Sequence, residues 1–189
     1  MTPLIIAFLG ISGVGKSTFL RDSARTMSFQ HLTAGYLIGQ ARDAEIAHDY
    51  LRLQNISDNQ DLLVKGFQIR RDAGAACVVL DGHAVIDGAS GLEMIDVDIF
   101  RRLGVNAVAH LEADPQQIFA NREGDGSRAR PVRSADELRE HQNLSLARSM
   151  AIAREMTIPF ARLQAGETEA FALVVQNIAD SNDQLCGRR

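Results

Sequence analysis

Hydrophobic positions along the chain follow two alternating patterns. Runs that are apolar at almost every position predict buried strands at residues 3–9, 77–80, 107–111 and 158–163, and residues 30–33 are a shorter candidate. Between these runs, helical spacing of apolar residues covers residues 16–27, 34–53, 58–72, 96–103, 134–156 and 167–179, and a further segment from Pro115 onward. Strands and helices that alternate in this way indicate an α/β fold, with a parallel sheet covered by helices.

Local signals support these boundaries and set one segment apart. Pro115 suits the first turn of a helix, and Ser134 with Glu137 has the pattern of a capping box. Residues 124–133 contain glycine and arginine without apolar periodicity, so we interpret them as a mobile loop. Because no repeat or linker interrupts the pattern, we interpret residues 1–189 as a single domain.

The most informative motif follows the first predicted strand. Gly10, four further residues and then Gly15-Lys16-Ser17 form a P-loop between a strand and a helix. Glycines let the backbone wrap around phosphate oxygens, and the start of the helix adds partial positive charge. Lys16 is expected to reach the β- and γ-phosphates of ATP. The residues predicted to bind ATP are Gly10, Ser12, Gly13, Val14, Gly15, Lys16, Ser17 and Thr18.

Two oxygen donors are predicted to hold the Mg²⁺ ion that accompanies the triphosphate. The Ser17 hydroxyl, directly after the P-loop lysine, is the first. Asp81 is the second, because it follows the apolar residues 77–80 and a carboxylate at that end of a core strand can hold the ion or its water shell. A turn-forming role for the Asp81-Gly82 pair is the alternative interpretation.

The arginine-bearing loop supplies the cations that phosphoryl transfer requires. Arginine can hold two phosphate oxygens at once, and a closing loop excludes water from the transferred group. A lid is therefore expected at about residues 122–133, in which Asp125 is a candidate to orient one guanidinium; a solvated surface loop is the alternative. The residues predicted to be catalytic are Lys16, Arg122, Arg128 and Arg130.

These motifs occur in an order that resembles the archaeal-type adenylate kinases. After the P-loop come Leu80-Asp81-Gly82-His83, then Asn121-Arg122-Glu123-Gly124-Asp125-Gly126-Ser127-Arg128-Ala129-Arg130, and then Glu140-His141-Gln142. The resemblance implies a P-loop NTPase fold whose five-stranded parallel sheet is covered by helices on both faces, with an arginine-bearing lid. It also implies reversible transfer of the ATP γ-phosphate to a nucleoside monophosphate.

The chain departs from this resemblance on the acceptor side. Residues 32–35 resemble the stretch that opens the acceptor-binding helix of ordinary adenylate kinases, but Gly39 stands where those kinases carry an arginine. They also have a Pro-Arg pair where this chain has Ala84-Val85. Arg42, Arg70 or Arg71 can replace these arginines, or can be surface charges on helices. The residues assigned to acceptor binding are Thr33, Gly35, Arg42, Asp81 and His83.

Histidines near the predicted site have two interpretations each. His83 lies two residues beyond a strand-end aspartate, at the edge where α/β folds bind ligands, so it either contacts the acceptor or has a structural role. Residues 82–91 are interpreted as a glycine-rich loop in which Asp87 faces the acceptor. His141 and Gln142 are expected to brace the lid helix rather than to contact substrate.

Composition excludes several classes of partner. A net charge of −4 gives no support to a nucleic-acid binder, and the apolar residues 3–9 are too few to cross a membrane. Cys77 lies in an apolar run and is expected to be buried, whereas Cys186 is expected to be a free thiol, which fits a reducing compartment. We therefore expect a cytoplasmic protein; the oligomeric state is not predicted.

Three functions are consistent with these features. The principal hypothesis is a phosphotransferase that uses ATP and Mg²⁺ to phosphorylate a nucleoside monophosphate. The second is a kinase of a small non-nucleotide metabolite, which the missing acceptor arginines favour. The third is an ATP-binding regulatory module with little transferase activity, which would not need an arginine lid.

Overall fold

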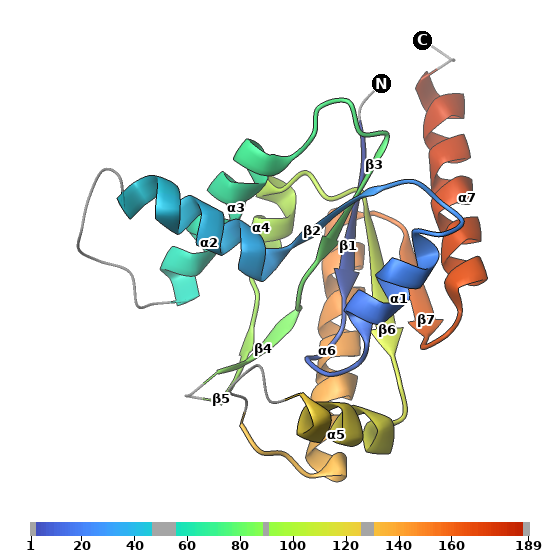
Figure 1. Ribbon diagram of the computed structural model, residues 1–189. Coiled ribbons are helices and arrows are strands. Elements are labelled where there is room, and N and C mark those ends of the chain that lie inside the picture. The colour runs from blue at the N-terminus through green and yellow to red at the C-terminus, as the bar shows by residue number, and fades with distance from the viewer. Residues whose placement is uncertain (1–2, 47–55, 89–90, 126–130, 187–189) are drawn as a thin grey trace.

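A computed structural model describes residues 3–46, 56–88, 91–125 and 131–186 of the chain. Within these residues, five parallel strands form one central sheet in the order β2-β3-β1-β6-β7 (Figure 1). The strands are β1 (Leu4–Leu9), β2 (Gln30–Thr33), β3 (Cys77–Asp81), β6 (Ala107–Glu112) and β7 (Phe160–Gln164). The predicted five-stranded parallel sheet is thereby confirmed, and each strand lies close to its expected bounds.

Strand β1 lies in the middle of the sheet and is buried along its whole length. It pairs with β3 on one side, where Phe8 is opposite Asp81, and with β6 on the other, where Leu9 is opposite His110. Because helices cover both faces of the sheet, β1 is apolar on both, which explains the continuous run that predicted it. The carboxyl ends of the parallel strands share one edge, so the P-loop and Asp81 meet there.

Helices cover both faces of this sheet (Figure 1). On one face lie α1 (Lys16–Ser23) and α7 (Thr168–Cys186). On the other lie α3 (Ile56–Arg70), α4 (Val97–Arg102) and α6 (Ala135–Met156), with α2 (Ala34–Ile46) packed against α3. The short helix α5 (Pro115–Gly124) lies at the carboxyl edge of the sheet, beside the P-loop. The predicted arrangement of helices on both faces is confirmed.

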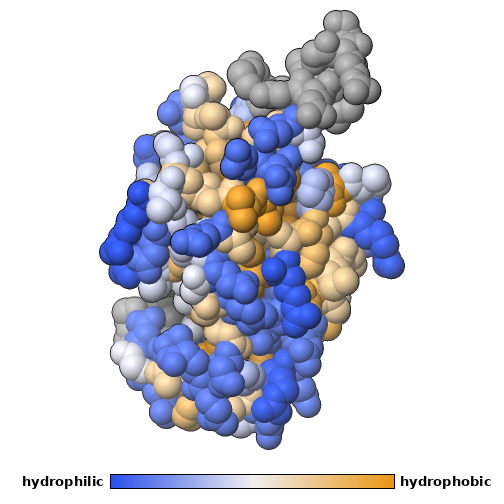
Figure 2. All heavy atoms as spheres, turned by 90° about the vertical axis from the view of Figure 1, so that its right-hand side faces the viewer, coloured by the Kyte–Doolittle hydropathy of each residue, from blue (hydrophilic) through white to orange (hydrophobic). Residues whose placement is uncertain are grey.

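Aromatic side chains join α1 and α7 to the sheet. The ring centroids of Phe8, Phe19 and Phe171 lie 5.3 to 5.9 Å apart, a separation typical of favourable aromatic pairs. Figure 2 shows the outer face that carries α7, where hydrophobic residues appear in several places among hydrophilic ones. The last helix continues to Cys186, beyond the expected end at residue 179, and its core contacts come from residues 170–178.

A β-hairpin is the element that the sequence pattern did not predict. Strand β4 (Val85–Gly88) pairs antiparallel with β5 (Gly91–Met94) inside the segment interpreted as a glycine-rich loop, so that interpretation was wrong. Each strand has only four residues, and glycine at the turn ends hides any alternation of apolar and polar residues. The hairpin extends from the carboxyl edge of the sheet, on the same side as α5 (Figure 1).

Helix boundaries follow the local signals more closely than the periodicity does. The capping box of Ser134 and Glu137 is confirmed, and Asp96 caps α4 by accepting a hydrogen bond from the backbone of Asp98. Helix α1 ends at Ser23 instead of residue 27. The expected extension of α2 over residues 47–53 lies outside the described residues. No helix in the described part of the chain is long and apolar enough to span a membrane.

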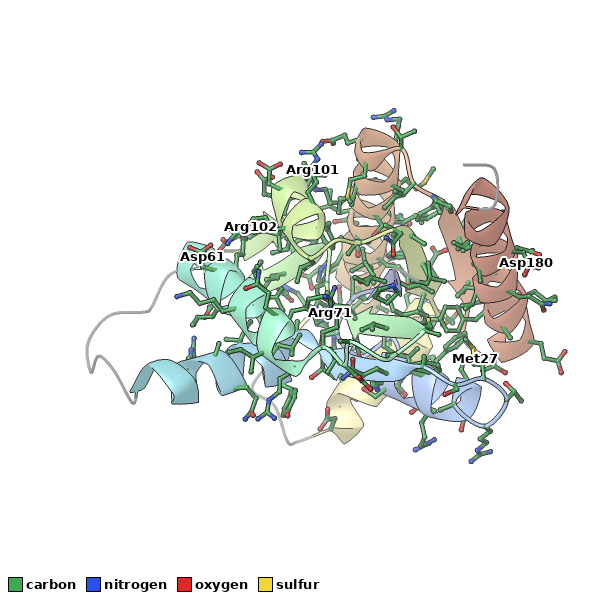
Figure 3. All side chains as sticks on the ribbon, turned by 90° about the horizontal axis from the view of Figure 1, so that it is seen from above. Met27, Asp61, Arg71, Arg101, Arg102 and Asp180 are labelled. Atoms are coloured by element: carbon green, nitrogen blue, oxygen red, sulfur yellow. The ribbon has the colours of Figure 1, made fainter. Side chains whose placement is uncertain are left out.

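Helices α2 and α3 approach each other very closely at Gly66. A Cβ atom at Gly66 would lie 2.2 Å from the carbonyl oxygen of Leu37, so only glycine permits this contact. Figure 3, which views the molecule from the end opposite the P-loop, shows Arg102 of α4 beside Asp61 of α3, where the two charged groups are 2.7 Å apart. Helices α2, α3 and α4 therefore form one connected wall.

Two titratable side chains in the core, those of Cys77 and His110, have strongly shifted pKa values. Burial raises the pKa of the Cys77 thiol to about 11, so this thiol stays protonated and unreactive, as expected from its apolar surroundings. His110 of β6 is fully buried, and its Nε2 lies 3.2 Å from the Ser145 hydroxyl of α6. Burial, and then the charges of Lys16 and Arg162, lower the pKa of His110 to about 4.

The depressed pKa of His110 predicts acid sensitivity of the fold. An unfolded histidine titrates near pH 6.5, so stability is fully present above that pH and declines as pH falls toward 4. The expected loss between pH 7.5 and 5 is about 2 kcal/mol of unfolding free energy, at about 1.4 kcal/mol per pH unit. Urea unfolding at both pH values measures it. His110→Gln should remove most of this dependence, and an unchanged acid loss in that variant would contradict the assignment.

Candidate active site

The P-loop turns from the end of β1 into α1 with a backbone that only glycine adopts without strain. Gly15, the N-cap of α1, has a φ of 97°, in the left-handed region. Gly13 has a φ of 88°, and a Cβ there would lie 2.7 Å from Cγ of Arg122. Glycine at this position therefore also lets α5 pack directly against the loop.

Lys16 is buried at the start of α1 and lies at the centre of the site. Its Nζ donates a hydrogen bond to the Gly10 carbonyl at 2.8 Å. The same atom lies 3.7 Å from a carboxylate oxygen of Asp81 and 3.4 Å from Nε2 of His83. The structure thus brings together three residues that sequence reasoning had chosen separately.

Asp81 occupies the end of β3, where its two carboxylate oxygens face different partners. One oxygen faces Lys16, and the other lies 3.6 Å from Nε2 of His31 on β2. Hydroxyl and carboxylate oxygens are ligands that Mg²⁺ prefers, so Ser17 and Asp81 form a chemically suitable donor pair. They can hold this ion near a triphosphate.

An open cleft of about 530 Å³ extends from the P-loop toward α5. Its lining includes Ser12, Gly13, Gly15, Lys16, Ser17 and Thr18, together with His83, Ala120, Asn121, Gly124 and Asp125. Val14 differs from the other predicted ATP-binding residues, because its side chain is buried in the core and its backbone N–H donates to Ile11. The cleft is polar and long enough to receive a triphosphate.

Arg122 of α5 packs against the P-loop beside this cleft. Its Nε donates a hydrogen bond to the Ser12 carbonyl at 2.9 Å, and its side chain is only 8% exposed. Arg128 and Arg130, the other two predicted lid arginines, lie outside the described residues. Asp87 of β4 lies 3.7 Å from Arg122 and 2.9 Å from Arg133. Asp87 therefore faces arginines, and the expectation that its segment faces the acceptor stays a prediction.

A second cavity, of about 170 Å³, lies on the other side of His83. Most of its walls are aliphatic or aromatic side chains from β1, β3, α2, α3, α4 and the hairpin, among them Ile38, Leu63, Ile86 and Phe100. Polar groups enter its lining from Asn59, Gln60 and His83. Because His83 lines both the cleft and this cavity, it marks their junction.

The remaining predicted acceptor residues lie around the start and outer face of α2. Thr33 caps this helix, because its hydroxyl accepts a hydrogen bond from the Tyr36 backbone at 3.2 Å. A Cβ at Gly35 would meet no atom within 4 Å, so the helix surface is open there. Arg42 donates to Asn59 at 2.5 Å, which places its guanidinium at the rim of the apolar cavity.

Arg70 and Arg71, the other two candidates, are placed as surface charges. The guanidinium of Arg70 lies over the Tyr36 ring, and that of Arg71 lies over the Phe67 ring, at 5.7 and 5.9 Å from the ring centroids. Neither residue lines the apolar cavity. Arg42 is therefore the described helix arginine whose position suits an acceptor phosphate.

Helix α6 is fixed at the site by its own polar side chains. Gln142 exchanges hydrogen bonds with both backbone groups of Ala113, each at 3.1 Å, and Nε2 of His141 lies 3.4 Å from the Val85 carbonyl. Burial is the largest effect on the pKa of His141 and lowers it, although the hydrogen bond to Val85 and the charge of Asp87 act in the opposite direction. The expectation that these two residues brace the helix is confirmed.

Comparison with known proteins assigns the chain to a family. The model of the family described as an AAA domain matches residues 9–139, which is more than half of the chain. The chain belongs to the AAA domain family. The matched span of this AAA domain contains the P-loop, Asp81 and Arg122, the residues around which the polar cleft is built.

The chain is also similar to archaeal adenylate kinases. It is 28% identical over 158 residues to the adenylate kinase of Pyrococcus furiosus, covering 80% of this chain and 81% of that protein. It is 24% identical over 192 residues to the adenylate kinase of Thermococcus onnurineus, covering 98% of each. The predicted resemblance to archaeal-type adenylate kinases is confirmed, and with it the enzyme class, a phosphotransferase of the nucleoside monophosphate kinase type.

Solved structures confirm the fold of the AAA domain. The shikimate kinase from Acinetobacter baumannii in complex with shikimate has a TM-score of 0.58 at 15% identity, and the match covers 96% of this chain and 95% of that one. A sugar kinase from Janibacter sp. HTCC2649 has a TM-score of 0.56 at 17% identity, covering 95% and 97%. These similarities show a P-loop kinase fold.

Sequence reasoning missed two residues at the site of the AAA domain. His31 contacts Asp81 because β2 and β3 are neighbours, with His31 opposite Val79 on the same face as Asp81. Residue spacing within β2 can suggest that face, but only the strand order places it beside Asp81. Asp87 lies 46 residues from Arg133 along the chain, and its hairpin carries no pattern that predicts the contact.

Proposed function

We infer that this AAA domain transfers the γ-phosphate of ATP to a nucleoside monophosphate, with Mg²⁺ held near Ser17 and Asp81. One observation carries the proposal: a polar cleft at the P-loop and an apolar cavity meet at His83. A donor phosphate in the first and an acceptor in the second would face each other at that junction. The cytoplasm, which supplies ATP, is the compartment we propose.

In phosphoryl transfer the protein positions the two substrates and stabilises negative charge, and it forms no covalent bond itself. Backbone groups of the P-loop and Lys16 would hold the β- and γ-phosphates. Arg122 lies against the Ser12 carbonyl, so its guanidinium can stabilise negative charge that spreads over the transferred group. Bound Mg²⁺ would bridge and neutralise phosphate oxygens. His83 would hold the acceptor phosphate next to Lys16.

The lining of the apolar cavity supports a nucleoside acceptor. A flat heteroaromatic base buries favourably between aliphatic and aromatic walls, and the carboxamide of Gln60 can read its polar edge. Arg42, held by Asn59, would supply the cation for the acceptor phosphate at the rim. A polyhydroxylated or carboxylate-bearing metabolite would leave its polar groups without partners in such a cavity, which argues against the metabolite-kinase alternative.

A substrate panel tests this function. The purified protein is incubated with Mg·ATP and AMP, GMP, CMP, UMP or dTMP, and in parallel with shikimate and simple sugars, and the products are separated by ion-exchange chromatography. We expect a nucleoside diphosphate and ADP from at least one monophosphate. Phosphorylation of a non-nucleotide alone would establish the metabolite kinase, and ADP formation with no acceptor at all would support a regulatory module.

Arg42→Ala tests the acceptor assignment. We expect a rise of about 10- to 100-fold in KM for the monophosphate, with little change in KM for ATP, because one charge-assisted contact to the acceptor phosphate is lost. Arg71→Ala is the matched control, since Arg71 lies over Phe67 and away from the cavity. Equal effects of the two substitutions would contradict the role of Arg42.

A further inference from the structure

Strand β4 lies between the apolar cavity and the arginines beside the P-loop, and neighbouring residues of the strand face opposite sides. Side chains alternate along a strand, so Ile86 and Asp87 point in opposite directions. Ile86 lines the apolar cavity, whereas Asp87 contacts the arginines at the P-loop side. One peptide unit therefore separates the wall of the proposed acceptor site from the cations of the proposed donor site.

Asp87 is a buried carboxylate held by two arginines. Its side chain is 7% exposed, and it accepts hydrogen bonds from Arg133 at 2.9 and 3.4 Å. Nη1 of Arg122 lies 3.7 Å from the same carboxylate. Burial alone would raise the pKa of Asp87, but the hydrogen bond and charge of Arg133, with the charges of His141 and Arg122, lower it instead. The carboxylate is therefore ionised and strongly paired.

The guanidinium of Arg122 is held at two points. On one side its Nε donates to the Ser12 carbonyl of the P-loop, and its aliphatic stem lies against Gly13. On the other side stands Asp87. An arginine fixed in this way keeps its planar fork in one orientation beside the P-loop, so less rotational freedom is lost when it binds phosphate.

The hairpin that carries Asp87 is anchored to α6. Nε2 of His141 lies 3.4 Å from the Val85 carbonyl, and Arg148 donates two hydrogen bonds to the Ile95 carbonyl at 3.0 and 2.7 Å. Arg133, which immediately precedes the cap of α6, completes the connection at the turn end. A hairpin fixed at both ends holds Ile86 and Asp87 as one rigid unit.

We propose that Asp87 is a positioning residue, which orients Arg122 toward the triphosphate and links that orientation to the wall of the acceptor cavity. The proposal rests on the inferred phosphotransfer. Asp87 itself touches no substrate; its effect passes through Arg122. Without the carboxylate, Arg122 loses the negative charge that faces its Nη1, and an acceptor that packs against Ile86 no longer shifts the arginine.

The variant Asp87→Asn keeps the shape of the side chain and removes its charge. We expect kcat to fall about 10- to 100-fold, with KM for ATP and the melting temperature nearly unchanged, because an orienting partner rather than a ligand is lost. Asp87→Glu should recover part of kcat. Asp136→Asn is the matched control, since Asp136 pairs with Arg139 on the exposed start of α6, and it should behave as wild type.

A binding measurement keeps the test independent of the acceptor. Mg·ADP with aluminium fluoride mimics the transferring phosphoryl group, and calorimetry without acceptor should show about tenfold weaker binding to Asp87→Asn, with ADP affinity unchanged. Adding the monophosphate should tighten the fluoride complex in the wild type more than in the variant. Unchanged affinity for the fluoride complex, or tighter ATP binding because Asp87 competes with phosphate for Arg122, would overturn the proposal. Failure of the wild type to phosphorylate any monophosphate would instead refute the proposed function.

Discussion

Replacement of Lys16 by alanine is expected to lower kcat/KM for phosphoryl transfer by about 1,000-fold or more. The Lys16 ammonium group is buried between the Gly10 carbonyl, Asp81 and His83, so nothing else in this position can carry its charge to the phosphates. Removal also takes from the Asp81 carboxylate its lysine partner and leaves the 3.6 Å contact to His31, and a carboxylate without that lysine would repel a polyanion. The result would be loss of nucleotide binding and of turnover together.

Steady-state kinetics and isothermal calorimetry with ATP measure this effect. Lys65→Ala is the matched control. It makes the same change of side chain, but at an exposed position of α3 outside the cleft. The control should retain wild-type turnover. Near-normal ATP affinity in Lys16→Ala, with a normal melting temperature, would show that the P-loop lysine is not the phosphate ligand.

Replacement of Gly66 by alanine is expected to destabilise the protein by about 3 kcal/mol, even though alanine is the better helix former. The added Cβ would lie 2.2 Å from the Leu37 carbonyl oxygen. A backbone atom cannot move aside as a side chain can, so α2 and α3 must separate. Since Ile38 and Leu63 both line the apolar cavity, the separation should widen it and raise KM for the acceptor.

Thermal unfolding and kinetics with both substrates test this prediction. Gly39→Ala, in the facing helix α2, is the matched control because a Cβ there meets no atom within 4 Å. That change should leave stability equal or raise it by about 0.5–1 kcal/mol. If Gly66→Ala behaved like Gly39→Ala, the close approach of the two helices would not exist in solution.

The donor half of the site could be predicted because its signals are local. The P-loop needs Gly15, Lys16 and Ser17 at fixed spacing, and this spacing can be recognised in the sequence without knowing how the rest of the chain folds. Asp81 followed from its place after an apolar run, because parallel strands bring their carboxyl ends to one edge. The capping box of α6 was visible for the same reason: its partners stand three residues apart.

The acceptor half could not be predicted in the same way, because its parts meet only in the folded chain. The apolar cavity draws on β1, β3, four-residue β4 and three helices, and residues of this kind look like ordinary core positions in sequence. The contact between Asp87 and Arg122 joins a hairpin without a pattern to a helix end. Arg42 was assigned to the acceptor, but the sequence could not show its contact with Asn59, which comes from the neighbouring helix α3.

The central place of β1 has a consequence for how this enzyme acquires its activity during synthesis. Its two neighbours, β3 and β6, begin at Cys77 and Ala107, far downstream of the strand they enclose. The P-loop is thus among the earliest segments translated. However, β1, which precedes it, can pair with both neighbouring strands only after Glu112, the last residue of β6, has been synthesised. Non-local pairings of this kind form slowly. Nascent chains shorter than this should show no affinity for nucleotide, and chaperones should encounter β1 as an exposed hydrophobic segment.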